Sequence, residues 1–268
     1  MGSRIKFLSY GISKMKGIIL AAGLGSRLGK LTVDLPKCLA ISWSGRTLLD
    51  AQIEALQSCG ITDIIIIRGY QGHKFTRTDV RYCWNTDYAL NNILESLICA
   101  EKELIEEVLI CYSDIWFQET IPMQLIKSNA DIAIAVDPNW KKNYAGRTDH
   151  PMSEAELVFF DSGFRLRNIG KLKVDHEKAN GEFLGMLKLS ASGSRTIKNY
   201  YNTAKSEFDG KPFQNAPSFK RAYITDLLQY MSDRGIPIEC KIINGEWREI
   251  DTIQDLERLK SLLSINDE

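Results

Sequence analysis

The chain has 268 residues, of which 44% are hydrophobic and 25% are charged. This length suits one large α/β domain, or a main domain with a small subdomain, whose core needs neither a metal nor a disulfide. The 34 basic and 34 acidic residues cancel, so the surface offers no long-range attraction to a polyanion, and a nucleic-acid partner is not expected.

Cysteine spacing and hydropathy exclude further classes. The six cysteines are scattered without a CxxC pair, which argues against a zinc ribbon or a secreted disulfide framework, so we expect reduced thiols. No apolar run approaches the roughly 20 residues that span a bilayer, and no signal peptide is evident. A cytoplasmic protein without a membrane partner is the expectation.

The first half of the chain alternates strand and helix patterns. Residues 1–16 carry no clear period and are interpreted as an N-terminal extension. Strands are predicted over 17–22, 63–68, 108–112 and 132–136, and helices over 48–59, 91–102 and 121–128. Such alternation is typical of βαβ units, so it predicts an α/β, Rossmann-like fold with a mostly parallel mixed sheet sandwiched by helices.

The rhythm changes after Pro138. Segments 156–160 and 164–169 flank the polar turn Asp161-Ser162-Gly163 and predict an antiparallel hairpin. Strands are then expected over 182–189 and 238–243, and helices over 192–208, 224–234 and 253–263. We therefore predict one domain over residues 17–268, with a small antiparallel insertion at about 138–190.

A buried strand runs directly into a glycine turn at LAAGLGSRL, residues 20–28. Glycine tolerates positive φ and has no Cβ, so main-chain N–H groups can approach phosphate oxygens there. Leu28 breaks the dinucleotide fingerprint, while Leu24 and Leu31 break the Walker A motif. Arg27 and Lys37 instead add two cations, which suit a triphosphate. The alternative is an ordinary βα turn with solvated cations.

The pattern LAAGxGxR, followed by Pro36-Lys37, resembles the signature of a nucleotidyltransferase family. That family includes the sugar-1-phosphate pyrophosphorylases and the phosphocholine and phosphonate cytidylyltransferases. Segments 136–140, 144–147, 181–185 and 247–256 are most similar to the cytidylyltransferase branch. The resemblance implies Mg²⁺-dependent transfer of a nucleoside monophosphate, with CTP preferred as its source, to a small phosphate or phosphonate acceptor with release of pyrophosphate.

The resemblance also implies which residues contact the nucleotide. Arg27 and Lys37 are the implied catalytic residues, holding the triphosphate and the α-phosphate. The implied nucleotide-binding set is Leu20, Ala21, Ala22, Gly23, Gly25, Ser26, Arg27, Gly69, Tyr70, Asn85 and Ser96. Ordinary packing would equally explain Tyr70, and Asn91-Asn92 would equally serve to cap a helix.

Two aspartates match the metal positions of the family. Asp114 follows the strand over 108–112, and Asp251 precedes the last predicted helix. Magnesium accepts one or two carboxylates while it keeps several waters, and ligands in open α/β sheets lie at strand ends. The alternatives are an ordinary loop carboxylate for Asp114 and a helix cap for Asp251.

The candidate acceptor-binding residues lie between positions 140 and 182. Arg147 and Lys171 suit a phosphonate, Trp140 and Tyr144 suit an alkylammonium through cation–π contact, and Glu182 suits an amine. Packing is the alternative for the two aromatic residues. The dispersed histidines, His73, His150 and His176, are interpreted as surface residues rather than a metal cluster.

Two other functions stay open at this stage. Within the same class, the chain would be a sugar-1-phosphate nucleotidyltransferase. From another class, it would be a regulatory domain that binds a nucleotide without turnover, although Arg27, Lys37, Asp114 and Asp251 argue against this. The oligomeric state is left open, with a homodimer as one option.

Overall fold

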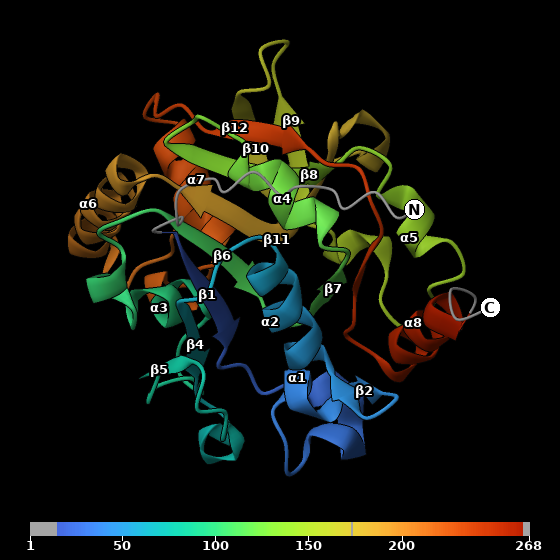
Figure 1. The fold of residues 1–268 in the computed structure, drawn as a ribbon. Coiled ribbons are helices and arrows are strands. Elements are labelled where there is room, and N and C mark those ends of the chain that lie inside the picture. The colour runs from blue at the N-terminus through green and yellow to red at the C-terminus, as the bar shows by residue number, and fades with distance from the viewer. Residues whose placement is uncertain (1–14, 173, 265–268) are drawn as a thin grey trace, which may run out of the picture.

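The computed structural model describes residues 15–172 and 174–264. Most of the predicted N-terminal extension, residues 1–14, lies outside the described residues. The described chain forms a central sheet with helices packed on both of its faces (Figure 1).

The central sheet has the order β10-β9-β11-β6-β1-β4-β5, and β8 and β12 extend it from β11. Its β5-β4-β1-β6 portion is parallel, whereas β11 runs antiparallel to its neighbours β6, β8 and β9. The strands are β1 (Lys16–Ala21), β4 (Ile64–Arg68), β5 (Arg81–Trp84), β6 (Val108–Tyr112), β8 (Ile132–Asp137), β9 (Leu157–Phe160), β10 (Leu166–Gly170), β11 (Gly181–Leu189) and β12 (Glu239–Ile242).

Helices and short strand pairs connect and cover this sheet. The helices are α1 (Lys37–Ala40), α2 (Leu48–Ser58), α3 (Ile93–Ile98), α4 (Thr120–Ile126), α5 (Lys141–Tyr144), α6 (Ala191–Phe208), α7 (Ile224–Ser232) and α8 (Ile253–Ser264). Two antiparallel pairs lie outside the main sheet: β2 (Ser42–Trp43) with β3 (Arg46–Thr47), and β7 (Ile115–Phe117) with β13 (Trp247–Glu249). Thr47 and Asp50 form a capping box, which fixes the start of α2.

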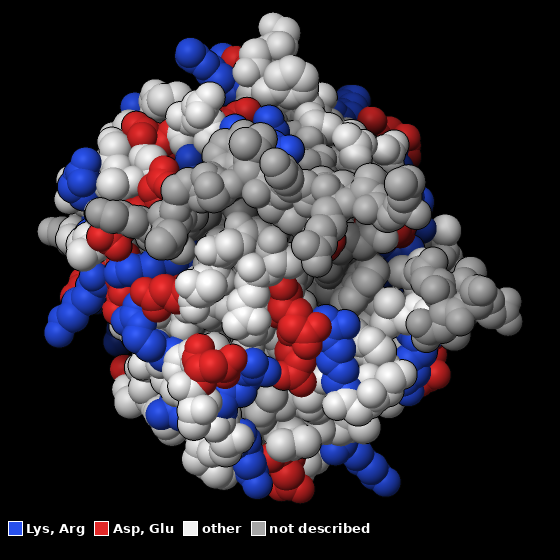
Figure 2. Space-filling view, in the orientation of Figure 1, with Lys and Arg blue, Asp and Glu red and all other residues white. Residues whose placement is uncertain are grey.

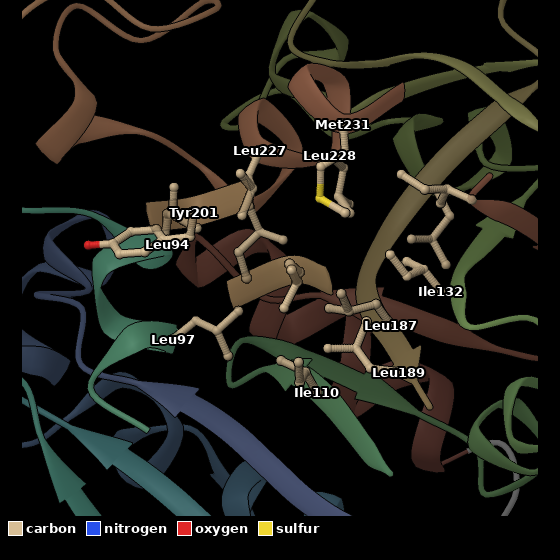
Figure 3. Packing of buried hydrophobic residues seen from close by; sticks show 14 of the residues in the cluster. Leu94, Leu97, Ile110, Ile132, Leu187, Leu189, Tyr201, Leu227, Leu228 and Met231 are labelled. Atoms are coloured by element: carbon tan, nitrogen blue, oxygen red, sulfur yellow. The ribbon is translucent and has the colours of Figure 1, made fainter. Parts of the chain in front are cut away.

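The core has two layers because successive strand residues point to opposite faces. On β1, Ile18 and Leu20 face a layer that α3, α6 and α7 contribute to, whereas Ile19 and Ala21 face a layer from α2 and α4. Figure 3 shows the first layer, where side chains of α3 and α7 point toward Ile110 and Leu187 of the sheet. Burial on both faces explains why the central strands are apolar without interruption.

The chain reverses direction across the sheet beside β1. From β1 it proceeds through α2 to β4 and β5 on one side, and it then crosses to β6 on the other side. In open α/β sheets, ligands bind outside the carboxyl ends of the strands at such a reversal. The loops after β1 and β6 are therefore the expected lining of a binding cleft.

The predicted fold class is confirmed: a mixed sheet lies between helices. The largest difference in boundaries concerns the helix predicted over residues 91–102, because α3 spans only Ile93–Ile98 and a 3-10 turn follows at Glu101–Glu103. Asn92 accepts a hydrogen bond from the Ile93 N–H at 2.9 Å, so the asparagine caps the helix rather than joining it.

A nucleic-acid partner and a membrane span were not expected from the net charge and the apolar runs of the sequence. Figure 2 shows basic and acidic residues side by side on the face in view rather than one large patch of either sign. Within residues 15–172 and 174–264, none of the helices combines the length and the apolar character that crossing a bilayer requires.

We predict that Gly193→Ala destabilises the fold. A Cβ at this position would lie 1.9 Å from the Asp131 carbonyl oxygen, so α6 would have to move away from the start of β8. Forced overpacking of this kind costs about 1–3 kcal/mol in the free energy of unfolding, which urea denaturation measures. Gly163→Ala is the control, because its Cβ would make only an ordinary 3.4 Å contact. Equal stability of the two variants would contradict the prediction.

Candidate functional site

A cavity of about 410 Å³ opens at the carboxyl ends of β1 and β6. One part of its wall is the segment Leu20 to Arg27, which begins at the end of β1, and another is Tyr112 to Ile115, which begins at the last residue of β6. Further lining comes from β11, β13, the segment around His150 to Glu156, and the start of α3 with the residues before it. The cavity therefore lies at the chain reversal where a ligand is expected.

The glycine turn needs glycine at Gly25. This residue has φ 62°, and a Cβ there would lie 2.9 Å from the Lys37 Cβ. Thr32 closes the turn, since its hydroxyl donates to the Gly25 carbonyl at 2.9 Å. Leu28 is fully buried in a cluster with α8 residues and fixes the segment that follows. The turn is thus held close to Lys37, as a phosphate-binding turn with a nearby cation requires.

Asp114 and Asp251 come together because β7 and β13 pair directly beside them. The Ile250 N–H donates to the Asp114 carbonyl at 2.8 Å, next to the register pair Glu249 and Ile115. The Lys37 Nζ lies 3.1 Å from the Asp114 Oδ2 and also bonds the Asp251 Oδ1. Two carboxylates from distant segments therefore share one ammonium group.

A second cation contacts the same cluster. The Arg27 Nη1 lies 2.6 Å from the Asp251 Oδ2, and its Nη2 lies 3.7 Å from the Glu154 Oε2. Arg27 is half exposed, whereas the Lys37 side chain is 11% exposed. Arg27 is therefore the more accessible of the two cations to a ligand, while Lys37 lies between the aspartates.

The charge states of Asp251 and Lys37 follow from their contacts with each other and with neighbouring charged groups. Burial alone would raise the pKa of Asp251, but Lys37, His150 and Arg27 outweigh it and hold that pKa well below its usual range. Burial alone would lower the pKa of Lys37, but Asp114 and Asp251 outweigh it and raise that pKa above the usual value. Asp251 is thus ionised and Lys37 is cationic at neutral pH.

The aspartate pair fits a hard divalent cation. Both aspartates line the cavity, and the Asp114 Oδ1 is buried without a hydrogen-bond partner among the described residues. The Asp114 Oδ2 and the Asp251 Oδ1 already contact a positive charge, the Lys37 ammonium. Magnesium accepts one or two such carboxylates and fills its remaining positions with water and phosphate oxygens.

A network behind the cavity fixes the backbone at Asp251. The Asp255 Oδ2 accepts hydrogen bonds from the N–H groups of Asp251 at 3.0 Å and Thr252 at 2.9 Å. Arg147 holds Asp255 through two hydrogen bonds of 2.6 and 3.0 Å and reaches the Glu249 Oε2 at 3.1 Å. Arg147, expected at the acceptor, instead lies outside the lining of the large cavity, with its side chain 4% exposed.

The other expected acceptor residues separate into two groups. Glu182 lines the cavity, and Tyr144 donates to its Oε1 at 2.6 Å. Burial raises the pKa of Glu182 well above its usual value and favours the neutral acid, whose Oε2 has no partner in the described chain. Trp140 is fully buried and packs edge-on against Tyr144 in an apolar cluster, so it does not line the cavity.

The residues expected near the base are also divided. Ser96 lines the cavity, and its hydroxyl accepts a hydrogen bond from the buried Asn85 at 2.9 Å. Asn85 does not line the cavity but exchanges hydrogen bonds with Asn91, which does. The Tyr70 hydroxyl donates to the Val33 carbonyl at 2.6 Å, and Gly69 packs against Ala22. Tyr70 and Gly69 therefore support the glycine segment from behind.

Several cavity residues were not predicted from the sequence. Among the charged and polar ones are Glu154, Glu156, Tyr223, Glu249 and His150. The interpretation of His150 as a surface residue is wrong, because it is 3% exposed and its Nδ1 lies 3.0 Å from the Asp251 Oδ2. The alternation Trp247-Arg248-Glu249-Ile250-Asp251 was a usable signal for Glu249, since strand residues two apart share a face.

The cavity wall also carries a basic and an acidic side chain, Lys171 and Glu156. The Lys171 Nζ lies 2.6 Å from the Glu154 Oε2 and 5.2 Å from the centre of the Tyr223 ring. Glu156 accepts a hydrogen bond from Thr225 at 2.8 Å, and burial raises its pKa to about 7. Burial and the nearby carboxylates of Asp251 and Asp114 also raise the pKa of Glu249.

Comparisons with known proteins show the family of the chain. The family model described as the MobA-like NTP transferase domain matches residues 17–238. The chain is 29% identical over 256 residues to the CTP:phosphoglutamine cytidylyltransferase of Campylobacter jejuni, covering 91% of this chain and 98% of that protein. It is 38% identical over 118 residues to the choline-phosphate cytidylyltransferase of Streptococcus pneumoniae, covering 42% of this chain and 51% of that protein.

A solved structure extends the likeness to the whole fold. The CTP:phosphocholine cytidylyltransferase from Streptococcus pneumoniae superposes with a TM-score of 0.71 at 25% identity. The superposition covers 93% of this chain and 99% of that one.

The raised pKa of Glu156 predicts a pH-dependent stability that Glu156→Gln removes. The Glu156 carboxyl has a pKa of about 7 in the folded chain, against 4.5 when it is not buried. Between these two pH values the folded chain therefore keeps a proton on Glu156 that the unfolded chain has released. The free energy of unfolding of the wild type therefore falls as pH rises from 4.5 to 7, by about 1–3 kcal/mol. Urea denaturation at several pH values measures it, and parallel curves for the two proteins would contradict the assignment.

Proposed function

Because the chain belongs to the family of MobA-like NTP transferase domains and is a nucleotidyltransferase, we propose that it is a cytidylyltransferase. It transfers CMP from CTP to an oxygen of a small phosphate or phosphonate acceptor and releases pyrophosphate, with Mg²⁺ as cofactor. The relatives named above act on phosphoglutamine and phosphocholine with CTP, which supports this nucleotide and this class of acceptor.

The observation that carries the proposal is the convergence of Asp114 and Asp251 on Lys37 beside the glycine turn. A turn, two cations and two carboxylates at one sheet edge match what a metal-bound triphosphate requires. A domain that only binds a nucleotide has no need for a lysine fixed between two metal-binding carboxylates.

Each group has a proposed role. The glycine turn and Arg27 hold the β- and γ-phosphates, because main-chain N–H groups and a guanidinium fork both suit phosphate oxygens. Lys37 contacts the α-phosphate, and Asp114 and Asp251 hold Mg²⁺. When bound, Mg²⁺ neutralises charge on the triphosphate.

The reaction needs no general base. A phosphate monoester with a second pKa of about 6 is largely a dianion at neutral pH, so its oxygen can attack phosphorus without first losing a proton. That oxygen forms a bond to the α-phosphorus while the bond to the bridging oxygen of pyrophosphate breaks in line. Lys37 stabilises the negative charge on the α-phosphate, and positioning supplies much of the remaining acceleration.

The acceptor is proposed to bind in the part of the cavity that Glu182, Glu156 and Lys171 line. Glu154, Lys171 and Glu182 all fall within residues 138–190, which supports the proposal that this segment is an insertion for reading the acceptor. Tyr144 supports Glu182 from behind, and Trp140 supports Tyr144. Near the base, Ser96 is proposed as a direct contact, positioned by Asn85.

A substrate panel tests the proposal. CTP and UTP are each combined with phosphocholine, 2-aminoethylphosphonate, glutamine phosphate and glucose 1-phosphate in the presence of Mg²⁺, and pyrophosphate release is measured. We expect CTP with one of the first three acceptors to be turned over fastest. Faster turnover of UTP with glucose 1-phosphate would favour a sugar-1-phosphate enzyme, and no release from any pair would overturn the proposal.

We predict that Lys37→Ala and Asp114→Asn each lower kcat/KM by at least about 10²-fold, since each removes charge stabilisation from the transition state. Pyrophosphate release with the preferred pair measures this, and circular dichroism checks that each variant is folded. Lys127→Ala is the matched control, because Lys127 is exposed after α4 and does not line the cavity. Full activity in either variant would remove that residue's role.

A further inference from the structure

We propose that the acceptor carries an ammonium group with at least one N–H, and that this group donates a hydrogen bond to Glu182 in the wall of the cavity. A primary ammonium suits this site, whereas a quaternary ammonium such as that of choline does not. The inference rests on the proposed function, because it names the class of acceptor for the same cavity and the same reaction.

The carboxyl group of Glu182 has one oxygen with a partner and one without. Tyr144 donates its hydroxyl to the Oε1 at 2.6 Å. The Oε2 is buried and has no hydrogen-bond partner within residues 15–172 and 174–264, although Glu182 lines the cavity. A buried acceptor without a donor is unfavourable, and a ligand that brings an N–H removes this cost. A quaternary ammonium has no N–H and leaves the oxygen as it is.

Tyr144 holds Glu182 in place from behind. It is 7% exposed, its ring packs edge-on against Trp140 with the ring centres 5.5 Å apart, and the guanidinium carbon of Arg147 lies 5.1 Å from its centre. Neither Tyr144 nor Trp140 lines the cavity. A phenol has a single hydrogen to donate, so Tyr144 satisfies the Oε1 and leaves the Oε2 as the atom that a ligand can use.

The charges in the cavity wall favour a cation in the acceptor. The Lys and Arg side chains that line the cavity are Arg27, Lys37 and Lys171, and each forms an ion pair with Asp251 or Glu154. Glu182 forms no ion pair with any described residue, and burial raises its pKa well above the usual value. A positively charged group beside Glu182 would stabilise its carboxylate, so a cation is favoured over a neutral amide.

A quaternary ammonium would instead need aromatic faces, because cation–π contact takes the place of hydrogen bonds for such a group. Trp140 and Tyr144, which were expected to supply these faces, do not line the cavity. Tyr223 does line it, but the Lys171 ammonium already lies 5.2 Å from the centre of its ring. These three aromatic residues therefore do not form a cage for a quaternary ammonium.

Acceptors that differ only in N-methylation test the inference. The first series is 2-aminoethylphosphonate with its N-methyl, N,N-dimethyl and N,N,N-trimethyl forms, and the second pair is phosphoethanolamine with phosphocholine. Glutamine phosphate with a free or a trimethylated α-amino group gives the same comparison for a longer acceptor. Pyrophosphate release with CTP and Mg²⁺ is measured. We expect kcat/KM to fall at least about 10-fold when the last N–H is replaced, because the buried acceptor of Glu182 is then left unpaired.

Glu182→Gln identifies the residue that reads the ammonium. We expect KM for the unmethylated acceptor to rise at least about 10-fold with a smaller change in kcat, and the discrimination against the trimethylated form to fall. A merely structural role would weaken both acceptors equally and leave their ratio unchanged. Glu101→Gln is the matched control, because Glu101 is exposed and lies outside the cavity lining. If circular dichroism shows that Glu182→Gln is unfolded, Glu182→Asp takes its place, with the same fall in discrimination expected.

The results separate this inference from the proposed reaction. Equal or faster turnover of the trimethylated acceptors, or a preference for an acceptor without nitrogen, would overturn the inference and leave nucleotidyl transfer in place. If no acceptor supports pyrophosphate release, the proposed reaction fails, and isothermal titration calorimetry then tests the inference by binding alone. Tighter binding of the unmethylated acceptor would uphold the inference, whereas equal affinities or no binding would overturn it.

Discussion

The structure depends on one partly buried charge cluster, in which the ammonium of Lys37 lies between the carboxylates of Asp114 and Asp251. Removing three charges from water is costly unless each is paired, so the elements that carry them are held in one relative position. Lys37 begins α1 after the glycine turn, Asp114 follows β6, and Asp251 follows β13. The pairing of β7 with β13 and the network of Asp255 and Arg147 serve to keep this cluster assembled.

The sequence predicted the parts of the fold that local patterns control. Apolar runs located β1, β4, β6 and β8, because strands buried on both faces need no polar residue. Three- and four-residue spacing of apolar residues located α2 and α4. The short strands β5, β7 and β13 were not predicted as strands. They have three or four residues each, and long-range pairing determines them.

The candidate site was predictable where a motif was contiguous. The glycine turn, Arg27 and Lys37 are close in sequence. Asp114 follows a predicted strand and Asp251 precedes a predicted helix, so resemblance and position indicated both aspartates. His150 was missed because it precedes Pro151 in an irregular segment, where no periodicity shows which way a side chain points. Arg147 and Trp140 were expected at the acceptor on residue chemistry alone, which does not distinguish a ligand contact from a residue that supports one.

The distance in sequence between Asp114 and Asp251 has a consequence for biosynthesis. The chain is made from the N-terminus onward, so the segments of Lys37 and Asp114 leave the ribosome before β13 is made. A nascent chain that has not reached β13 carries only one of the two carboxylates that contact Lys37. An abortive translation product that stops there therefore cannot form the charge cluster, whatever part of the sheet it folds.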